Sequence, residues 1–163
     1  MKKALCLVFA LLLTLSLTGC TPTKTISSIE LTMEVPEDMQ DVSQNEDVLG
    51  YGFNFAMENQ EMFICGLRQD MSDIENGRTM TLEEYTHQLI ELYGLQGRAS
   101  HGERLDYMYL RFTKPLENGV NEYLCGAYRC DGAFWLIQIN GLTQNFDEAD
   151  WYDYLDSVEF TDN

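Results

Sequence analysis

The chain has 163 residues, 45% of them hydrophobic and 12% aromatic, which is enough for one ordinary domain with an apolar core. Its 27 acidic and 10 basic residues give a formal net charge of −17, whereas nucleic-acid binding requires a basic surface. The composition therefore excludes nucleic acid as an expected partner.

The first 20 residues predict a bacterial lipoprotein signal peptide. Two lysines precede an uncharged apolar run at 4–17, which is about 14 residues long and too short to span a bilayer, since a spanning helix needs about 20. The run ends in Leu-Thr-Gly-Cys at 17–20, which matches the lipobox pattern. We expect cleavage between Gly19 and Cys20, and attachment of a diacylglyceryl thioether and an N-acyl chain such as palmitate to Cys20.

The signal also predicts where the protein works. Two or more acyl chains anchor a protein stably, so the lipid bilayer is the expected partner through Cys20, on the extracytoplasmic side of the cell membrane. We divide the chain into a signal peptide at 1–19, a lipidated cysteine with a polar tether at 20–28, and a single domain at 29–163. A tether of this length keeps the domain within roughly 29 Å of the bilayer.

The first half of the domain is expected to begin with strands. Alternating apolar residues predict a strand at 26–35, which Pro36 ends. A second alternating run at 51–57 is followed by a polar turn and a third strand at 62–68, so these two strands are expected to form a hairpin.

A helix and another strand follow. Thr81 and Glu84 have the spacing of a capping box, and Gly94 is typical of a helix end, so a helix is predicted over 81–93. Its apolar residues recur at helical spacing: Leu82, Tyr85, Leu89 and Leu92. Alternation over 105–114 predicts the next strand, with Met108, Leu110 and Phe112 opposite Tyr107, Tyr109 and Arg111.

The clearest turn signal is Asp131-Gly132, which predicts a two-residue type I′ turn between strands 120–130 and 133–140. This register places Cys130 opposite Ala133, Tyr128 opposite Trp135 and Gly126 opposite Ile137. Both faces of the hairpin are apolar, so a helix is expected on each: the 81–93 helix on one, and a helix over 146–156 leading into a last strand at 158–160 on the other. The expected fold class is α+β, an α/β/α sandwich around a central antiparallel sheet.

This order of elements resembles the PsbP-like superfamily, including the DcrB-like proteins. The positions that carry the resemblance are the first strand leading into Val35-Pro36, the helix opening at Thr81, the aromatic hairpin and the final helix running into 157–160. The resemblance implies the fold and weakly favours a non-enzymatic role. Photosynthetic relatives help to retain inorganic cofactors, but no matching ligand set is visible, and no functional residue can be transferred.

Three cysteines remain in the domain, because Cys6 leaves with the signal and Cys20 is lipidated. Cys125 and Cys130 are expected on opposite faces of one strand, roughly 16 Å apart, whereas a disulfide needs Cα atoms within about 7 Å. Three alternatives stay open: buried free thiols, a disulfide of Cys65 with Cys125 or Cys130, or a zinc site, for which the ligand spacing is absent.

The sequence contains no motif that names a reaction, so we expect no catalytic residues, no metal and no cofactor. The favoured interpretation is a non-catalytic binding or adaptor module of an envelope complex, whose partner is an envelope protein or a small ligand. The alternative is a hydrolytic or metal-assisted enzyme assembled from dispersed acids and His87 or His101. That enzyme would require one of the two histidines within about 5 Å of a carboxylate in a cleft.

Overall fold

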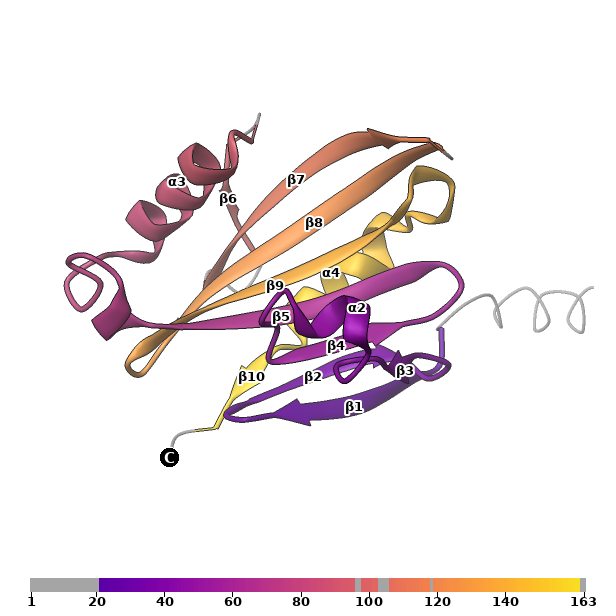
Figure 1. The fold of residues 1–163 in the computed structure, drawn as a ribbon, viewed down its shortest axis with the longest axis horizontal. Helices are drawn as coiled ribbons and strands as arrows, with labels where there is room; N and C mark the ends of the chain where they lie inside the picture. Colours follow the sequence, from indigo (N-terminus) through magenta and orange to yellow (C-terminus); the bar gives the residue numbers. More distant parts are fainter. Residues whose placement is uncertain (1–20, 96–97, 103–105, 118, 162–163) are drawn as a thin grey trace, which may run out of the picture.

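The computed structural model describes residues 21–95, 98–102, 106–117 and 119–161. The predicted lipobox, with its cleavage site at Gly19 and Cys20, lies outside them. The described chain forms two antiparallel sheets and three helices (Figure 1). The helices are α2 (Glu46–Leu49), α3 (Leu82–Tyr93) and α4 (Glu148–Asp156), and short 3₁₀ turns occur at Met71–Asp73 and Thr143–Asn145.

The larger sheet has seven strands in the order β3-β4-β5-β9-β8-β7-β6, and the smaller has three in the order β1-β2-β10. The strands of the larger sheet are β3 (Gln40–Asp41), β4 (Phe55–Glu58), β5 (Met62–Asp70), β6 (Ser100–His101), β7 (Tyr107–Leu116), β8 (Gly119–Cys130) and β9 (Ala133–Leu142). Those of the smaller sheet are β1 (Thr23–Ser28), β2 (Leu31–Pro36) and β10 (Glu159–Phe160).

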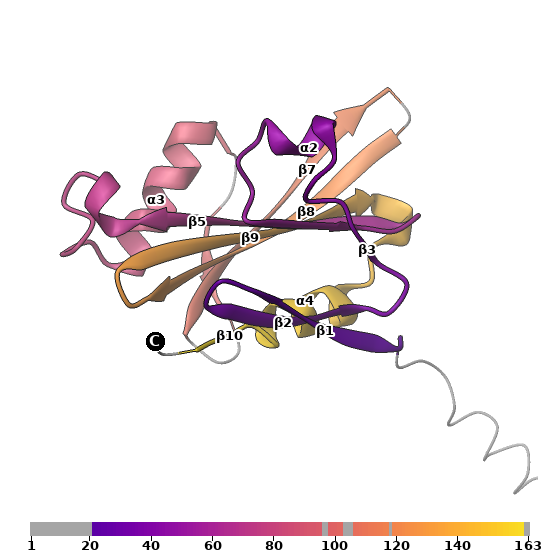
Figure 2. The same ribbon diagram turned by 60° about the horizontal axis from the view of Figure 1, so that its bottom comes forward.

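The larger sheet lies between two layers. Figure 2 shows α4 and the three-stranded sheet on one side of it, and α2 and α3 on the other. The predicted α+β class and the covering of the central hairpin on both faces are therefore confirmed. The sequence did not predict that β1, β2 and β10 form a separate sheet in the α4 layer. In the described part of the chain, no helix is long and apolar enough to cross a bilayer.

The main core lies between the larger sheet and the α4 layer. It contains the hairpin residues Leu124, Tyr128, Trp135, Ile137 and Ile139, which pack against Trp151 and Leu155 of α4 and against Leu31, Met33 and Val35 of β2. The register of β8 and β9 is the predicted one, since Cys130 pairs with Ala133, Tyr128 with Trp135 and Gly126 with Ile137. Because strand residues alternate between faces, this register also fixes which side chains point away from the main core.

The N-terminal prediction was wrong in two respects. The expected tether becomes β1 from Thr23 on, and the expected single strand at 26–35 is broken by a tight turn at Ile29-Glu30. β-Branched threonines and Ile26 favour an extended chain, and the turn lets this segment pair with β2 along its whole length. Ile29 has φ 52°, a left-handed conformation that sequence patterns do not assign to a β-branched residue.

Two local predictions were also wrong in detail. The expected strand at 51–57 begins only at Phe55, because the preceding residues form a turn with Gly52 at φ 71°. The Asp131-Gly132 turn connects the expected residues, but only Gly132 has a positive φ, 76°, as in a type II turn. A type I′ turn would require a positive φ at Asp131 as well.

The helix predictions agree with the structure. The Glu84 backbone N–H donates to Thr81 Oγ1 at 3.2 Å, and the Thr81 N–H donates to Glu84 Oε2 at 2.8 Å, which completes the capping box of α3. Gly94 ends the helix at φ 60°. Tyr85 stacks on Phe134 with ring centroids 4.2 Å apart, and this contact fixes α3 on the face of the sheet opposite α4.

Candidate functional site

One face of the larger sheet is only partly covered, and we call it the open face. Its side chains alternate along each strand with those that point into the main core. Among them are Leu110, Cys125, Gln138 and Cys65, which lie side by side on β7, β8, β9 and β5. α3 covers one end of this face, where its Leu89 packs with Ala127 of β8 and Phe134 of β9. The α2 segment covers the β4–β5 edge through contacts among Val42, Val48, Phe53, Ala56, Cys65 and Phe63.

A cavity of about 330 Å³ lies on the open face between these two coverings. This volume is at the small end of the range of about 300–1,000 Å³ that is usual for ligand pockets. Its floor is formed by small and medium side chains, including Cys65, Cys125, Ala127, Leu136 and Gln138. The cavity is thus a mainly apolar site with one amide and two thiols on its floor.

Exposed apolar side chains surround the mouth of the cavity. Tyr51 and Tyr93 line it and are 71% and 57% exposed. Tyr51 also stacks on Phe53, with ring centroids 5.6 Å apart. Large apolar side chains that gather at a concave site and remain in contact with water are typical of a binding surface.

Lys114 is the only charged residue among the described residues that line the cavity. Its Nζ lies 5.3 Å from the ring centroids of both Phe112 and Tyr123, and these two rings stack on each other. No carboxylate of the described chain forms an ion pair with Lys114. The cavity therefore has at one end a positive charge that pairs with no described carboxylate, in a chain with a strongly negative total charge.

The two cavity thiols are not activated. Burial, with a smaller contribution from the nearby Cys125, raises the pKa of Cys65 to about 12. Burial also raises the pKa of Cys125 to about 12, against a smaller opposing effect of the Lys114 charge. Because the thiolate is the nucleophilic form of cysteine, both side chains act at neutral pH as small apolar groups.

All three domain cysteines are free thiols, one of the alternatives that the sequence left open. Cys65 and Cys125 both pair in register with Gln138, so one strand separates them and their Cα atoms are roughly 10 Å apart. Cys130 points into the opposite face, where its Sγ contacts Glu30 Oε1 at 3.2 Å. Neither of the disulfides considered from the sequence is formed.

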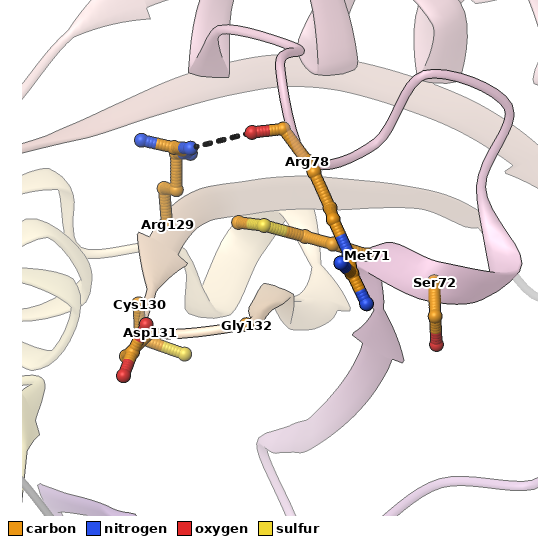
Figure 3. A pocket seen from close by; sticks show the side chains of 7 residues that line it. All are labelled: Met71, Ser72, Arg78, Arg129, Cys130, Asp131 and Gly132. Carbon is orange, nitrogen blue, oxygen red and sulfur yellow. Dashed lines mark hydrogen bonds between the residues drawn. The ribbon is translucent and has the colours of Figure 1, made fainter.

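A second depression lies at the tip of the β8–β9 hairpin (Figure 3). It is lined by Arg78, Arg129, Asp131 and neighbouring residues. The Arg129 guanidinium donates to the Arg78 backbone carbonyl at 3.3 Å, while the Arg78 side chain runs toward Met71. The two guanidinium groups do not converge on one point, and Asp131 also lines the depression, so this surface is a weaker candidate than the cavity.

The groups that the enzyme alternative requires are not brought together among the described residues. His87 on α3 and His101 on β6 are both exposed, neither lines the cavity, and neither forms an ion pair or hydrogen bond with a described carboxylate. The described residues contain no group of three or more histidines, cysteines or acids that could hold a metal ion. Of the acids near α4, Asp147 caps the helix by accepting from the Ala149 N–H at 3.0 Å, and Glu148 lies 3.5 Å from Arg111.

Tyr107 lies in the main core, and the partly buried Tyr109 packs against it. Tyr107 is buried and stacks on Tyr128 with ring centroids 4.9 Å apart, and Tyr109 meets Tyr152 of α4 edge-on, also at 4.9 Å. Near them, Arg111 Nε donates to the buried Glu122 at 2.6 Å and its guanidinium lies 4.2 Å from the Phe146 ring centroid. These contacts connect α4 to the sheet.

The sequence matches no protein-family model and no curated protein, but solved structures are similar to this one. A crystal structure of a protein from Bacteroides thetaiotaomicron VPI-5482 aligns with a TM-score of 0.56 at 11% identity. The alignment covers 88% of this chain and 50% of that protein, so the present chain spans half of its length. The solution structure of cyanobacterial PsbP (CyanoP) from Synechocystis sp. PCC 6803 aligns with a TM-score of 0.50 at 9% identity, over 88% of this chain and 95% of that one.

The chain therefore has a PsbP-like fold, as the order of its elements indicated. At sequence identities of 9% and 11%, these alignments show the fold alone, and no functional residue can be transferred from them. The cavity itself was not predicted from the sequence. Alternation placed Ala127 and Leu136 on one face of the hairpin and Tyr128 and Trp135 on the other, but it gave no sign that α3 covers only one end of its face.

Proposed function

We propose that the chain is an exported lipoprotein, anchored through Cys20 on the extracytoplasmic side of the cell membrane, and that it acts as a non-catalytic binding module. The observation that carries the binding role is the cavity on the open face: it has the size of a ligand site and an exposed aromatic rim. Its lining offers apolar surface, an amide, protonated thiols and a single lysine, which suit retention of a ligand better than its conversion.

The start of the described chain indicates which face of the domain a lipid anchor on Cys20 would bring to the bilayer. Thr21 Oγ1 donates to Asp150 Oδ2 of α4 at 2.8 Å, and the Glu37 N–H donates to the Pro22 carbonyl at 2.8 Å. The residue after Cys20 is thus already held against the domain, and a lipid on Cys20 would keep α4 and β1 close to the bilayer. An acidic body is repelled by anionic lipid, so the acyl chains would supply the attachment.

The anchor is tested by fractionation and intact-mass measurement of the full-length protein and of Cys20→Ala. We expect the wild type in the membrane fraction, beginning at Cys20 with the mass of a diacylglyceryl group and an acyl chain, and Cys20→Ala as an uncleaved precursor. Cys20→Ala that is matured and still membrane-bound would disprove the lipoprotein assignment.

The binding role is tested by gentle extraction of the wild type from the membranes of the producing cell. A small molecule or a protein that co-purifies in a stoichiometric amount is the expected result. The enzyme alternative would be favoured, and the binding role overturned, by two results together. The extracted protein would carry neither a small molecule nor a partner protein, and it would hydrolyse a substrate in a reaction that His87→Ala or His101→Ala abolishes.

A further inference from the structure

The polarity of the open face changes along its strands. At the α3 end, Met108, Ala127, Leu136 and Leu67 form one apolar row across β7, β8, β9 and β5. The next row contains Leu110, the two thiols and Gln138, and the following row contains Phe112, Tyr123, Asn140 and Phe63. Lys114 lies beyond them on β7, in a row with Asn121 and Leu142. A ligand that matches this face is apolar along most of its length and meets amide groups and one positive charge toward its far end.

The length of this gradient limits the size of the ligand. Lys114 lies six positions after Met108 on the same strand, so the face extends roughly 20 Å from its apolar end to its charged end. The cavity volume of about 330 Å³ accommodates one short or medium acyl or alkyl chain, and it is small for a two-chain phospholipid. The lining thus fits a single-chain molecule better than a membrane lipid.

The charge at the polar end defines the head group. Lys114 is held over the faces of Phe112 and Tyr123, and it pairs with no carboxylate of the described chain. A cation beside a partly enclosed apolar site attracts an anion and disfavours a cation. We propose that the cavity binds a free single-chain amphiphile with one anionic head group, with its chain beneath α3 and its head at Lys114. This inference rests on the proposed function of the cavity as a ligand site.

The anionic amphiphile could come from solution or from the bilayer, and the fold favours solution. The described polypeptide begins at Thr21, beside α4. The cavity lies on the opposite face of the larger sheet, the face that carries α2 and α3 (Figure 2). A lipid on Cys20 would therefore bring the α4 face toward the membrane and leave the cavity mouth directed away from it.

Photo-crosslinking of the full-length protein in phosphatidylcholine nanodiscs tests this assignment. The probes are decanoate, decanol and decylamine, each with a diazirine at the end of the chain. We expect decanoate to label α3 and the β7–β9 peptides around the cavity more strongly than the other two probes. Lys114→Gln should lower labelling by decanoate about three- to tenfold and leave labelling by decanol unchanged.

Two variants serve as controls. Arg98→Gln removes one positive charge from an exposed residue outside the cavity and should leave all labelling unchanged. Leu136→Trp fills the cavity and should remove the cavity label of every probe, provided that circular dichroism shows a folded protein. Should that variant not fold, Tyr51→Ser at the exposed rim should weaken cavity labelling by all three probes without affecting the fold.

The possible outcomes separate this inference from the proposed function. Equal labelling of the cavity by the three probes, or a decanoate preference that survives Lys114→Gln, would overturn the anionic ligand and leave the binding site intact. Labelling that never reaches the cavity peptides would overturn both. Phosphatidylglycerol with the same diazirine, supplied in the nanodisc, should not label the cavity. Labelling by it at the level of free decanoate would overturn the assignment to a ligand in solution.

Discussion

Cys65 and Cys125 lie on either side of Gln138, on the two strands that flank β9, and both thiols face the cavity. The intervening strand keeps them too far apart for a disulfide. Burial raises the pKa of each to about 12, so both remain protonated under physiological conditions. This pair contributes small, uncharged side chains to the cavity floor, and the following two predictions depend on it.

Native Cys65 and Cys125 should react slowly with iodoacetamide. At pH 8, a pKa of about 12 in place of 9 lowers the thiolate fraction roughly a thousandfold. Pulse alkylation followed by peptide mass spectrometry measures each cysteine separately, and the same protein in urea supplies the unfolded rate. Similar rates for the two residues in the native and unfolded states would show that the thiols are accessible and ionised.

Stability should fall as the pH rises above 9. The folded state holds the thiol protons up to about pH 12, whereas the unfolded state releases them near pH 9, so the unfolded state binds fewer protons in this interval. The unfolding free energy should therefore decrease by about 1.4 kcal/mol per pH unit for each thiol. Urea titrations at pH 8, 9 and 10 measure this slope. In the Cys65→Ala, Cys125→Ala double variant it should fall to the part contributed by Cys130, whose pKa burial also raises to about 12. An unchanged slope in that variant would show that groups other than Cys65 and Cys125 cause the pH dependence of the unfolding free energy.

Glu30 should stabilise the turn between β1 and β2. Its Oε1 accepts hydrogen bonds from Trp135 Nε1 at 3.0 Å and from Arg68 Nε at 2.9 Å. Burial raises its pKa, but these hydrogen bonds and the one from Cys130 outweigh burial, so the pKa lies below 4.5. Glu30→Ala leaves the buried indole N–H of Trp135 without an acceptor and should cost about 2 kcal/mol at pH 7.

The cost of Glu30→Ala should depend on pH in a defined direction. A carboxyl group with a lowered pKa stabilises the fold above pH 4.5, and this contribution is lost as the pH falls through the folded-state pKa. Urea titrations at pH 7 and pH 3 should therefore give a smaller difference at pH 3. Glu34→Ala, at an exposed position of the same hairpin, is the control and should have little effect. Equal costs for the two variants would refute the role of Glu30.

Ile29→Asn should increase stability by about 1 kcal/mol. Ile29 is 68% exposed and has φ 52°, a conformation that costs a β-branched residue roughly 1–2 kcal/mol and that asparagine tolerates. Thermal unfolding measures the change. Val120→Asn replaces another exposed aliphatic residue that has no positive φ, so it should give no increase. A lower melting temperature for Ile29→Asn would mean that the Ile29 side chain makes a stabilising contact.

The parts of the fold that could be predicted were those determined by local chemistry. The capping box at Thr81 and Glu84 and the turn at Asp131-Gly132 fixed α3 and the β8–β9 register, because each depends on residues close together in the chain. The β1–β2 turn could not be predicted, since Ile29 adopts an unfavourable conformation and Glu30 is held by Trp135, 105 positions away. Long-range contacts of this kind leave no periodic signal.

The cavity could not be predicted for a similar reason. Alternation assigns side chains to the two faces of a sheet, but the extent to which α3 covers its face depends on where Tyr85 stacks on Phe134. Leu92 continued the apolar spacing of the helix, yet it is 75% exposed, whereas Tyr93, which lies outside that spacing, lines the cavity. The spacing of apolar residues along the helix therefore did not indicate the site.

Native mass spectrometry of the protein extracted from its own membranes tests the location of the binding site most directly. Wild type and Leu136→Trp are extracted side by side, with circular dichroism to show that both are folded. We predict a bound small molecule on the wild type that is absent from Leu136→Trp, because the indole fills the cavity between α3 and the thiol row. The same molecule on both proteins, in equal amounts, would contradict the account and place the site elsewhere.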